Sequence, residues 1–173
     1  MRRCHPSPLP RRWLMTDERM GDGLWEALAR LPRGSGVVFR HYSLPPAARR
    51  ALFERVRRIA RRQRFLLVAA GPARVGRGMA GSHGRHYGAL TAPVHSLREA
   101  MAAERAGARL VFVSPIYATR SHAGARVLGR ARLGLMIRKV EVPVIALGGM
   151  DERRWRALRL LGVHGWAGID AWL

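Results

Sequence analysis

The fold is decided by one stretch of the sequence, ALTAPVHSLREAMAAERAGARLVFVSP, which runs from residue 89 to residue 115. Residues 89–94 and 110–114 are runs of strand length with high apolar content. Between them, Ser96 and Glu99 match the capping box, in which the two side chains reciprocally satisfy free amides at a helix start. Strand, helix and strand in this order predict a parallel βαβ unit.

The same alternation extends outward from this stretch in both directions. Apolar residues at helical spacing, such as Leu24, Leu28 and Leu31, separate most of the expected strands. We expect strands at residues 13–17, 37–40, 65–68, 79–80, 89–94, 110–114, 143–147 and 165–171, and glycine-rich loops in the rest of 71–88. Strands that are apolar on both faces predict a parallel sheet covered by helices. A doubly wound open sheet and a (β/α)₈ barrel both satisfy this pattern.

The composition bounds the class of protein. The chain has 173 residues, of which 48% are hydrophobic, and one domain with a buried core is expected. Apolar runs fall far short of the roughly 20 residues that span a bilayer, and residues 1–12 lack the apolar region of a secretory signal. The single cysteine, Cys4, excludes an internal disulfide. We expect a cytoplasmic protein without a membrane partner.

The charge is strongly positive and almost entirely due to arginine. Thirty-two basic residues against eleven acidic ones give +21, and Lys139 is the only lysine. Selection for phosphate contact alone would not avoid lysine, because both residues neutralise a backbone charge. We interpret many arginines as solvated helix faces and expect no specific nucleic-acid binding. The examples are Arg49, Arg50, Arg57, Arg58, Arg61 and Arg62.

Six motifs occur in a fixed order along the chain. They are LMTD at 14–17, FR at 39–40, LTAPVHS at 90–96, VSPIYATRSH at 113–122, ALGGM at 146–150 and GWAGIDA at 165–171. Together they resemble the thiamine phosphate synthase/TenI family over residues 12–173. The resemblance implies a TIM (β/α)₈ barrel preceded by a flexible basic extension, residues 1–11. The barrel is expected to be shortened, without its last helix and with a reduced third helix; Trp172 and Leu173, or a second subunit, would cover the exposed strands.

The resemblance also implies a phosphate site at the carboxyl ends of the last strands, where TIM barrels often bind phosphate. Gly148 and Gly149 would bring backbone amides close to the phosphate. Thr119 and Ser121 would add hydroxyl donors. The final strand end would contribute Ile169 and Asp170, although Asp170 stands where the family has a serine. His95 would line the pocket.

The family joins an aminopyrimidine diphosphate to a thiazole phosphate and releases magnesium pyrophosphate. Arg40 stands where the family has a pyrophosphate-binding arginine, and His122 stands in place of a catalytic lysine. A second lysine is replaced by Tyr42. Mg²⁺ is the cofactor that the family implies, yet residues 55–98 contain no Asp or Glu to hold it. Coupling activity is therefore expected to be weakened or lost, with no metal ligand assigned.

Two other functions stay open at this point. One is a TenI-like isomerisation of thiazole phosphate, which needs acid and base groups rather than Mg²⁺; His95 or His122 would serve. The other is a non-catalytic barrel that binds phosphorylated small molecules or nucleic acid through its arginines. His83 and His86 have metal-ligand spacing, but we interpret them as solvated loop histidines because no carboxylate lies nearby in sequence.

Overall fold

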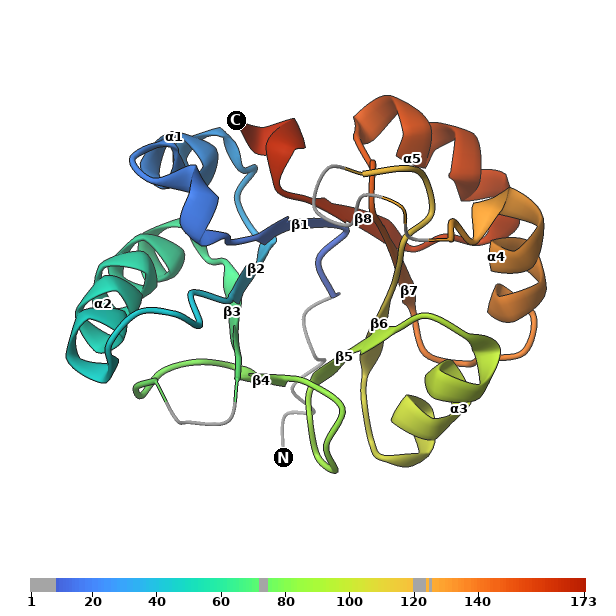
Figure 1. The fold of residues 1–173 in the computed structure, drawn as a ribbon, viewed down its shortest axis with the longest axis horizontal. Coiled ribbons are helices and arrows are strands. Elements are labelled where there is room, and N and C mark those ends of the chain that lie inside the picture. The colour runs from blue at the N-terminus through green and yellow to red at the C-terminus, as the bar shows by residue number, and fades with distance from the viewer. Residues whose placement is uncertain (1–8, 72–74, 120–123, 125) are drawn as a thin grey trace, which may run out of the picture.

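The computed structural model describes residues 9–71, 75–119, 124 and 126–173. Eight parallel strands pair in sequence order and close into a barrel, with β1 hydrogen-bonded to both β2 and β8 (Figure 1). This confirms the predicted TIM barrel. The strands are β1 (Arg12–Met15), β2 (Gly36–Phe39), β3 (Leu66–Ala70), β4 (Gly81–His83), β5 (Thr91–Val94), β6 (Leu110–Val113), β7 (Val144–Leu147) and β8 (Gly165–Gly168).

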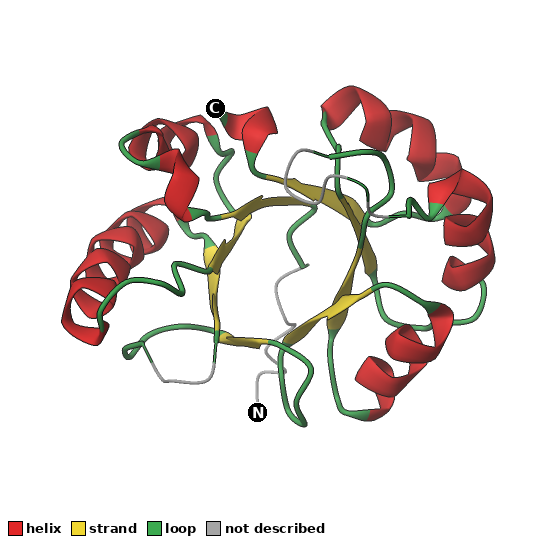
Figure 2. Ribbon diagram, viewed as in Figure 1, coloured by secondary structure: helices red, strands yellow, loops and turns green. Residues whose placement is uncertain are grey.

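Helices surround the barrel on most of its circumference (Figure 2). The α-helices are α1 (Gly23–Arg30), α2 (Pro46–Gln63), α3 (Leu97–Arg105), α4 (Gly129–Ile137) and α5 (Glu152–Leu158). Short 3₁₀-helices span Glu18–Met20, Arg159–Leu161 and Asp170–Trp172. At the start of α3, the Ser96 hydroxyl accepts from the Glu99 amide as the capping box predicts, while the Glu99 carboxylate accepts from the His95 amide. The capped strand–helix–strand unit therefore forms where the sequence indicated it.

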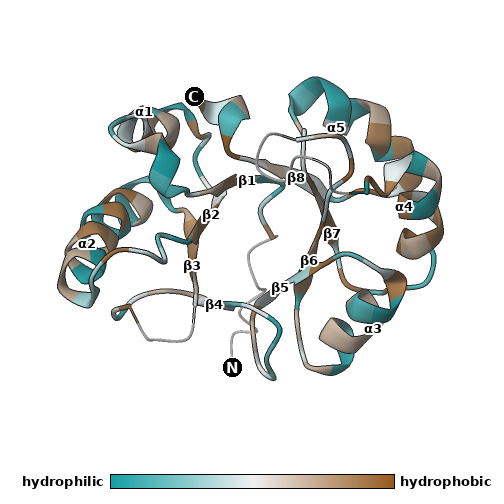
Figure 3. Cartoon of the chain, in the orientation of Figure 1, coloured by the Kyte–Doolittle hydropathy of each residue, from teal (hydrophilic) through white to brown (hydrophobic). Residues whose placement is uncertain are grey.

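The region around β4 departs most from the sequence-based expectation. The fourth strand lies at 81–83 rather than at 79–80, and Figure 3 shows it as hydrophilic, whereas its neighbour β3 is hydrophobic. We expected a reduced third helix, but described residues 75–80 and 84–90 on either side of β4 contain no helix. Gly81 permits the close packing here, because a Cβ atom at this position would lie 2.6 Å from the Leu90 Cβ.

The barrel interior is filled by large side chains from opposite strands. The ring centroids of Trp13 and Phe112 lie 5.1 Å apart in an edge-to-face arrangement, a geometry that aromatic pairs favour. The His83 ring also packs edge-to-face on Phe112, with 5.2 Å between the ring centroids. Gly36 is required beside Trp13, since a Cβ atom there would meet the indole at 2.1 Å. The interior is thus a packed core rather than a channel.

The end of the chain covers part of the barrel next to β8. Trp172 is 9% exposed, stacks on Trp166 at 4.8 Å, and donates its indole N–H to the Trp13 carbonyl. Leu173 is about half exposed and approaches Gly23 at the start of α1. Trp172 therefore provides the cover that the sequence analysis expected. The division at residue 12 stays a prediction; Leu9 packs on the core, and Pro10 accepts a hydrogen bond from the Trp13 indole.

The arginines of α2 are not all solvated. Arg50, Arg58, Arg61 and Arg62 are exposed, as interpreted from the sequence. Arg49 is only 8% exposed, so its assignment to a solvated face was wrong. Its helix begins beside the barrel mouth, and this places the Arg49 guanidinium against the ends of β2 and β3. Across the described part of the chain, the helices are all too short or too polar to cross a membrane.

Candidate functional site

The carboxyl ends of β2 and of β5–β8 meet at one cavity in the barrel mouth, with a volume of about 90 Å³. The cavity is lined by seven of the nine residues that the sequence analysis selected for the site. They are Arg40, His95, Thr119, Gly148, Gly149, Ile169 and Asp170. Ser121 and His122 lie outside the described residues. The seven residues thus lie on one surface, drawn from the ends of five strands; their role as a binding site stays a prediction.

Two glycines form the wall of the cavity after β7. Gly148 has a φ of +91° and Gly149 a φ of +59°, conformations that favour glycine. A Cβ atom on Gly148 would lie 2.8 Å from the Pro115 Cα, and one on Gly149 would lie 2.6 Å from the Ala118 carbonyl oxygen. Both positions therefore need glycine for the β7 end to pack against the loop after β6, which carries Thr119.

Acidic and basic groups are closely paired on the other side of the mouth. Asp17 accepts hydrogen bonds from the Arg19 amide and guanidinium, and the Arg40 guanidinium lies 3.6 Å from its carboxylate. Burial opposes ionisation of Asp17, but these bonds and charges hold its pKa below the ordinary value. Asp170 also interacts electrostatically with Arg19. Asp17 is therefore paired with two arginines, and Asp170 lies within the electrostatic range of one of them.

His95 has a defined ring orientation at the cavity edge. Its Nδ1 lies 2.7 Å from the Ser114 carbonyl oxygen, which can only accept a hydrogen bond, so Nδ1 carries the proton. In the neutral ring, Nε2 is then the basic nitrogen. Glu99 holds the His95 amide and pairs with Arg85 at 3.0 Å. The arrangement can accept a proton from a bound ligand.

Three buried polar residues behind Arg40 were missed by sequence reasoning. Thr16, His41 and Arg49 are each less than 9% exposed and are joined to one another or to the Arg40 backbone by hydrogen bonds. Burial lowers the pKa of His41, and the Arg49 and Arg40 charges add to this against the opposing charges of Glu18 and Asp17. The signals in the sequence were the adjacency of His41 to Arg40 and the place of Thr16 in the LMTD motif.

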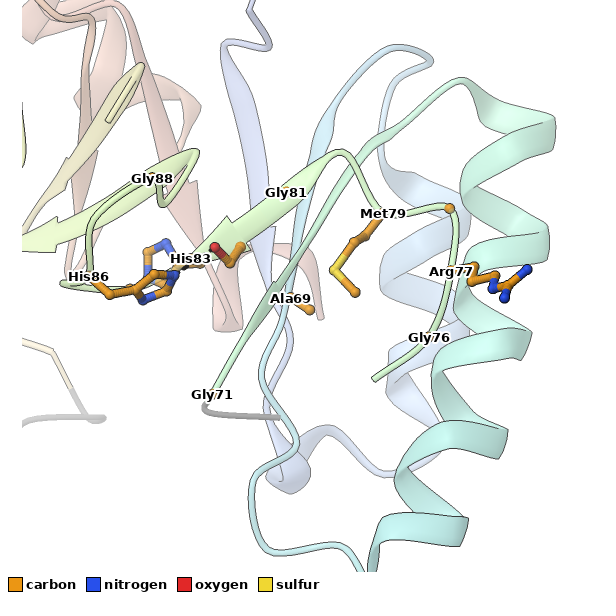
Figure 4. A pocket seen from close by; sticks show the side chains of 12 residues that line it. Ala69, Gly71, Gly76, Arg77, Met79, Gly81, His83, His86 and Gly88 are labelled. Carbon is orange, nitrogen blue, oxygen red and sulfur yellow. Dashed lines mark hydrogen bonds between the residues drawn. The ribbon is translucent and has the colours of Figure 1, made fainter. Parts of the chain in front are cut away.

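A second and larger cavity, of about 990 Å³, lies between β4 and α2 (Figure 4). Its lining is rich in glycine, with Met79 and Arg77 toward α2 and His86 toward the other end. Its lining includes the carboxyl ends of two strands, β3 and β4, whereas the ends of five strands converge on the mouth cavity. Catalytic groups of TIM barrels come from the ends of several strands, so the mouth cavity is the better functional candidate although it is smaller. The large cavity marks where the barrel has no described helix outside β4.

The interpretation of His83 as a solvated loop histidine was wrong. His83 ends β4, is 6% exposed, and lies 2.9 Å from the Thr91 hydroxyl through Nδ1. Burial, together with the Arg40 charge, lowers its pKa to about 4, so the ring is neutral near pH 7. Within the described residues, no three His, Cys, Asp or Glu side chains gather in a group that could hold a metal ion.

The donor chemistry of the mouth does not fit Mg²⁺. This ion is usually held by one or two carboxylates together with substrate phosphates. The carboxylates beside the cavity are Asp17 and Asp170, and both interact with Arg19. A cation there would have to displace arginine from Asp17. The described residues at the mouth therefore do not fit a divalent cation.

Comparison with known proteins identifies the class. A family model described as thiamine monophosphate synthase matches residues 85–172, just over half of the chain. The chain belongs to the thiamine phosphate synthase/TenI family, as its motifs predicted. The thiamine-phosphate synthase of Pyrococcus furiosus is 36% identical over 82 residues, and that of Pyrococcus horikoshii 34% over 82 residues. Each match spans 47% of this chain and 40% of the relative.

Structural similarity extends over more of the chain. The solved thiamine phosphate pyrophosphorylase from Pyrococcus furiosus superposes with a TM-score of 0.77 at 24% identity, covering 93% of this chain and 86% of that one. At this identity the superposition establishes the fold alone. The family model thus matches the C-terminal half of the chain, while the barrel architecture is shared almost throughout.

Proposed function

We propose that this chain is a thiamine phosphate synthase-like protein that binds phosphorylated small molecules of thiamine biosynthesis in the mouth cavity. One observation carries the proposal: a single cavity collects Arg40, His95, Thr119 and the strand ends after β7 and β8. The family membership supplies the ligand class, a thiazole phosphate. A cytoplasmic location and a second subunit beside β8 stay predictions.

The ligand phosphate would lie on the β6–β8 side of the cavity. The amides of Gly148 and Gly149 can approach it closely because neither residue has a side chain. The Thr119 hydroxyl can donate a hydrogen bond, and the Ile169 end of β8 closes the site. Asp170 brings a negative charge that Arg19 offsets. Ser121 and His122 keep the roles that the resemblance gives them, as a hydroxyl donor and a proton-carrying group.

The coupling reaction would place the leaving pyrophosphate near Arg40. A fixed cation stabilises the charge that develops on the leaving group, which is the usual source of catalysis in such reactions. This chain offers Arg40 for that role, but Tyr42 stands in place of a lysine and the nearby carboxylates are engaged by arginines. We therefore infer that coupling is weakened or lost while phosphate recognition is retained.

Calorimetry with thiazole phosphate tests the proposal. Replacing Thr119 with Ala should weaken binding about tenfold or more, since hydrogen bonds to charged groups are among the stronger ones. Ser43→Ala, which removes an exposed hydroxyl outside the cavity, is the matched control and should leave the affinity unchanged. No binding by the unaltered chain, or equal loss in both variants, would refute the assignment.

A second candidate function is isomerisation of the bound thiazole phosphate by proton transfer. The hydrogen bond from Nδ1 of His95 to the Ser114 carbonyl favours it, because it leaves Nε2 as a base at the cavity. Solvent deuterium should then enter the ligand in the presence of the protein, and His95→Gln should stop this exchange without removing binding. Exchange at the same rate in His95→Gln would exclude His95.

A further inference from the structure

The backbone of Arg40 is held from both directions. Its N–H donates to the Thr16 hydroxyl at 2.9 Å. The same hydroxyl lies 3.0 Å from Nδ1 of His41, the next residue along the chain. The His41 ring in turn stacks on Phe39 at 5.0 Å. Arg40 therefore follows β2 in the chain, and its two neighbours, Phe39 and His41, are both held in place by contacts within the barrel.

Arg49 completes this arrangement from α2. Its Nε donates to the His41 carbonyl at 2.8 Å, and its Nη2 donates to the Ala70 carbonyl at 2.5 Å. The guanidinium also lies over the Phe39 ring, 5.6 Å from the centroid. One planar side chain thus ties the segment after β2 to the end of β3. Arginine suits this task because its donors form a rigid fork.

The environment of Arg49 is unusual for a buried cation. Buried cations are normally paired with a carboxylate. In the parts of the chain that the structure describes, Arg49 has no carboxylate at ion-pairing distance; backbone carbonyls and an aromatic ring are its partners. At 8% exposure it offers a ligand little direct access. Its effect on a bound anion must therefore pass through the residues that it holds.

We propose that Arg49 is a positioning residue that fixes Arg40 for anion binding at the barrel mouth. Arg49 holds the His41 carbonyl, and the His41 ring and the Arg40 amide share the Thr16 hydroxyl. Without Arg49 the segment after β2 loses its tie to β3, and the Arg40 guanidinium is no longer fixed at the cavity. The inference rests on the proposed function, in that Arg40 is taken to bind an anionic group.

Calorimetry with inorganic pyrophosphate as the probe separates positioning from charge. Arg49→Met removes both the charge and the two donated bonds, and should weaken binding about tenfold, within the range for coupled neighbours. Arg49→Lys keeps the charge but not the rigid fork, and should stay almost as impaired. Full affinity in Arg49→Lys would show that charge alone matters and would overturn the proposal.

A double-mutant cycle tests whether Arg49 acts through Arg40. Once Arg40→Ala has removed the binding group, Arg49→Met should cause little further loss. An equal loss with and without Arg40 would overturn the proposal, as would pyrophosphate binding that does not depend on Arg40.

Thr16→Val, which keeps side-chain volume but removes the acceptor of the Arg40 amide, should reproduce the selective loss of pyrophosphate binding. Unchanged affinity in this variant would contradict the hydrogen-bond network. Thr16→Val and Arg49→Lys carry the test if Arg49→Met does not fold.

A binding measurement with thiazole phosphate distinguishes this inference from the proposed function. Its binding on the Thr119 side should be unaffected by Arg49→Met, because that side of the cavity makes no described contact with Arg49. If the chain binds pyrophosphate through Arg40 and Arg49 but never binds thiazole phosphate, the proposed function fails and the positioning role stands. If thiazole phosphate affinity falls equally in Arg49→Met, the variant has altered the whole mouth and the positioning role fails.

Discussion

The two halves of this barrel differ in how they are built. From β5 to β8, each strand is joined to the next by a helix, and the family model matches this half. From β3 to β5, the described connections are glycine-rich and non-helical, and they border the large open cavity. The mouth cavity draws on the C-terminal half for all its lining except Arg40. Under the proposed function, recognition of a phosphate would need only the C-terminal half, whereas expulsion of pyrophosphate would need both halves.

The largest expected effect is on coupling of the two thiamine precursors. The loss of a single preorganised contact to a developing anion commonly lowers the rate by a factor of about 10² to 10³. The N-terminal half lacks several family contacts, so the purified protein should form thiamine phosphate very slowly, and added Mg²⁺ should change little. Product formation followed with and without Mg²⁺ is the measurement. Fast Mg²⁺-dependent turnover, abolished by Arg40→Ala, would remove the functional difference between the halves.

The next effect concerns whether the halves fold as one unit. Phe112 from β6 packs on Trp13 from β1 and on His83 from β4, so it joins the halves through the interior. Phe112→Ala should cost about 3–5 kcal/mol of unfolding free energy, the usual range for a buried aromatic, in a single cooperative transition. Leu135→Ala on the exposed face of α4 should cost less than about 0.5 kcal/mol. Two separate transitions in chemical denaturation would mean that the halves fold independently.

Sequence periodicity and motifs were sufficient for the regular half and for the barrel class. The capping box located α3, and motif order brought Thr119, Gly148 and Ile169 to the strand ends that form one cavity. They failed where structure depends on contacts between distant residues. Nothing local distinguishes the buried Arg49 from its exposed neighbour Arg50, because burial follows from the carbonyls of His41 and Ala70. The fourth strand was predicted at the wrong position because the three residues of β4, Gly, Ser and His, carry no strand pattern.

A smaller effect is expected from pH, through His83. Burial, together with the Arg40 charge, lowers the pKa of His83 to about 4, whereas an unfolded chain would protonate it near 6.5. Between these values the unfolded state binds more protons, so stability should fall as pH decreases from about 6.5 to 4, by about 3 kcal/mol in total. Urea unfolding across this range measures the slope. His83→Gln should flatten the slope and the exposed His86→Gln should not; equal slopes in all three proteins would refute the assignment to His83.

The smallest effect compares matched glycines from the two halves. Gly149 and Gly78 both have positive φ, +59° and +78°, so alanine at either position should cost about 1–2 kcal/mol of stability from backbone strain. Their surroundings differ. A Cβ atom at 149 would meet the Ala118 carbonyl at 2.6 Å and displace the loop that carries Thr119, whereas one at 78 would meet only the flexible Arg57 side chain at 3.3 Å. Gly149→Ala should therefore weaken thiazole phosphate binding about tenfold, as expected when a contacting group is misplaced, while Gly78→Ala should leave the affinity unchanged. Calorimetry and thermal unfolding of the two variants separate strain from recognition, and an equal loss of affinity in both would show that the mouth site depends on the whole barrel rather than on its regular half.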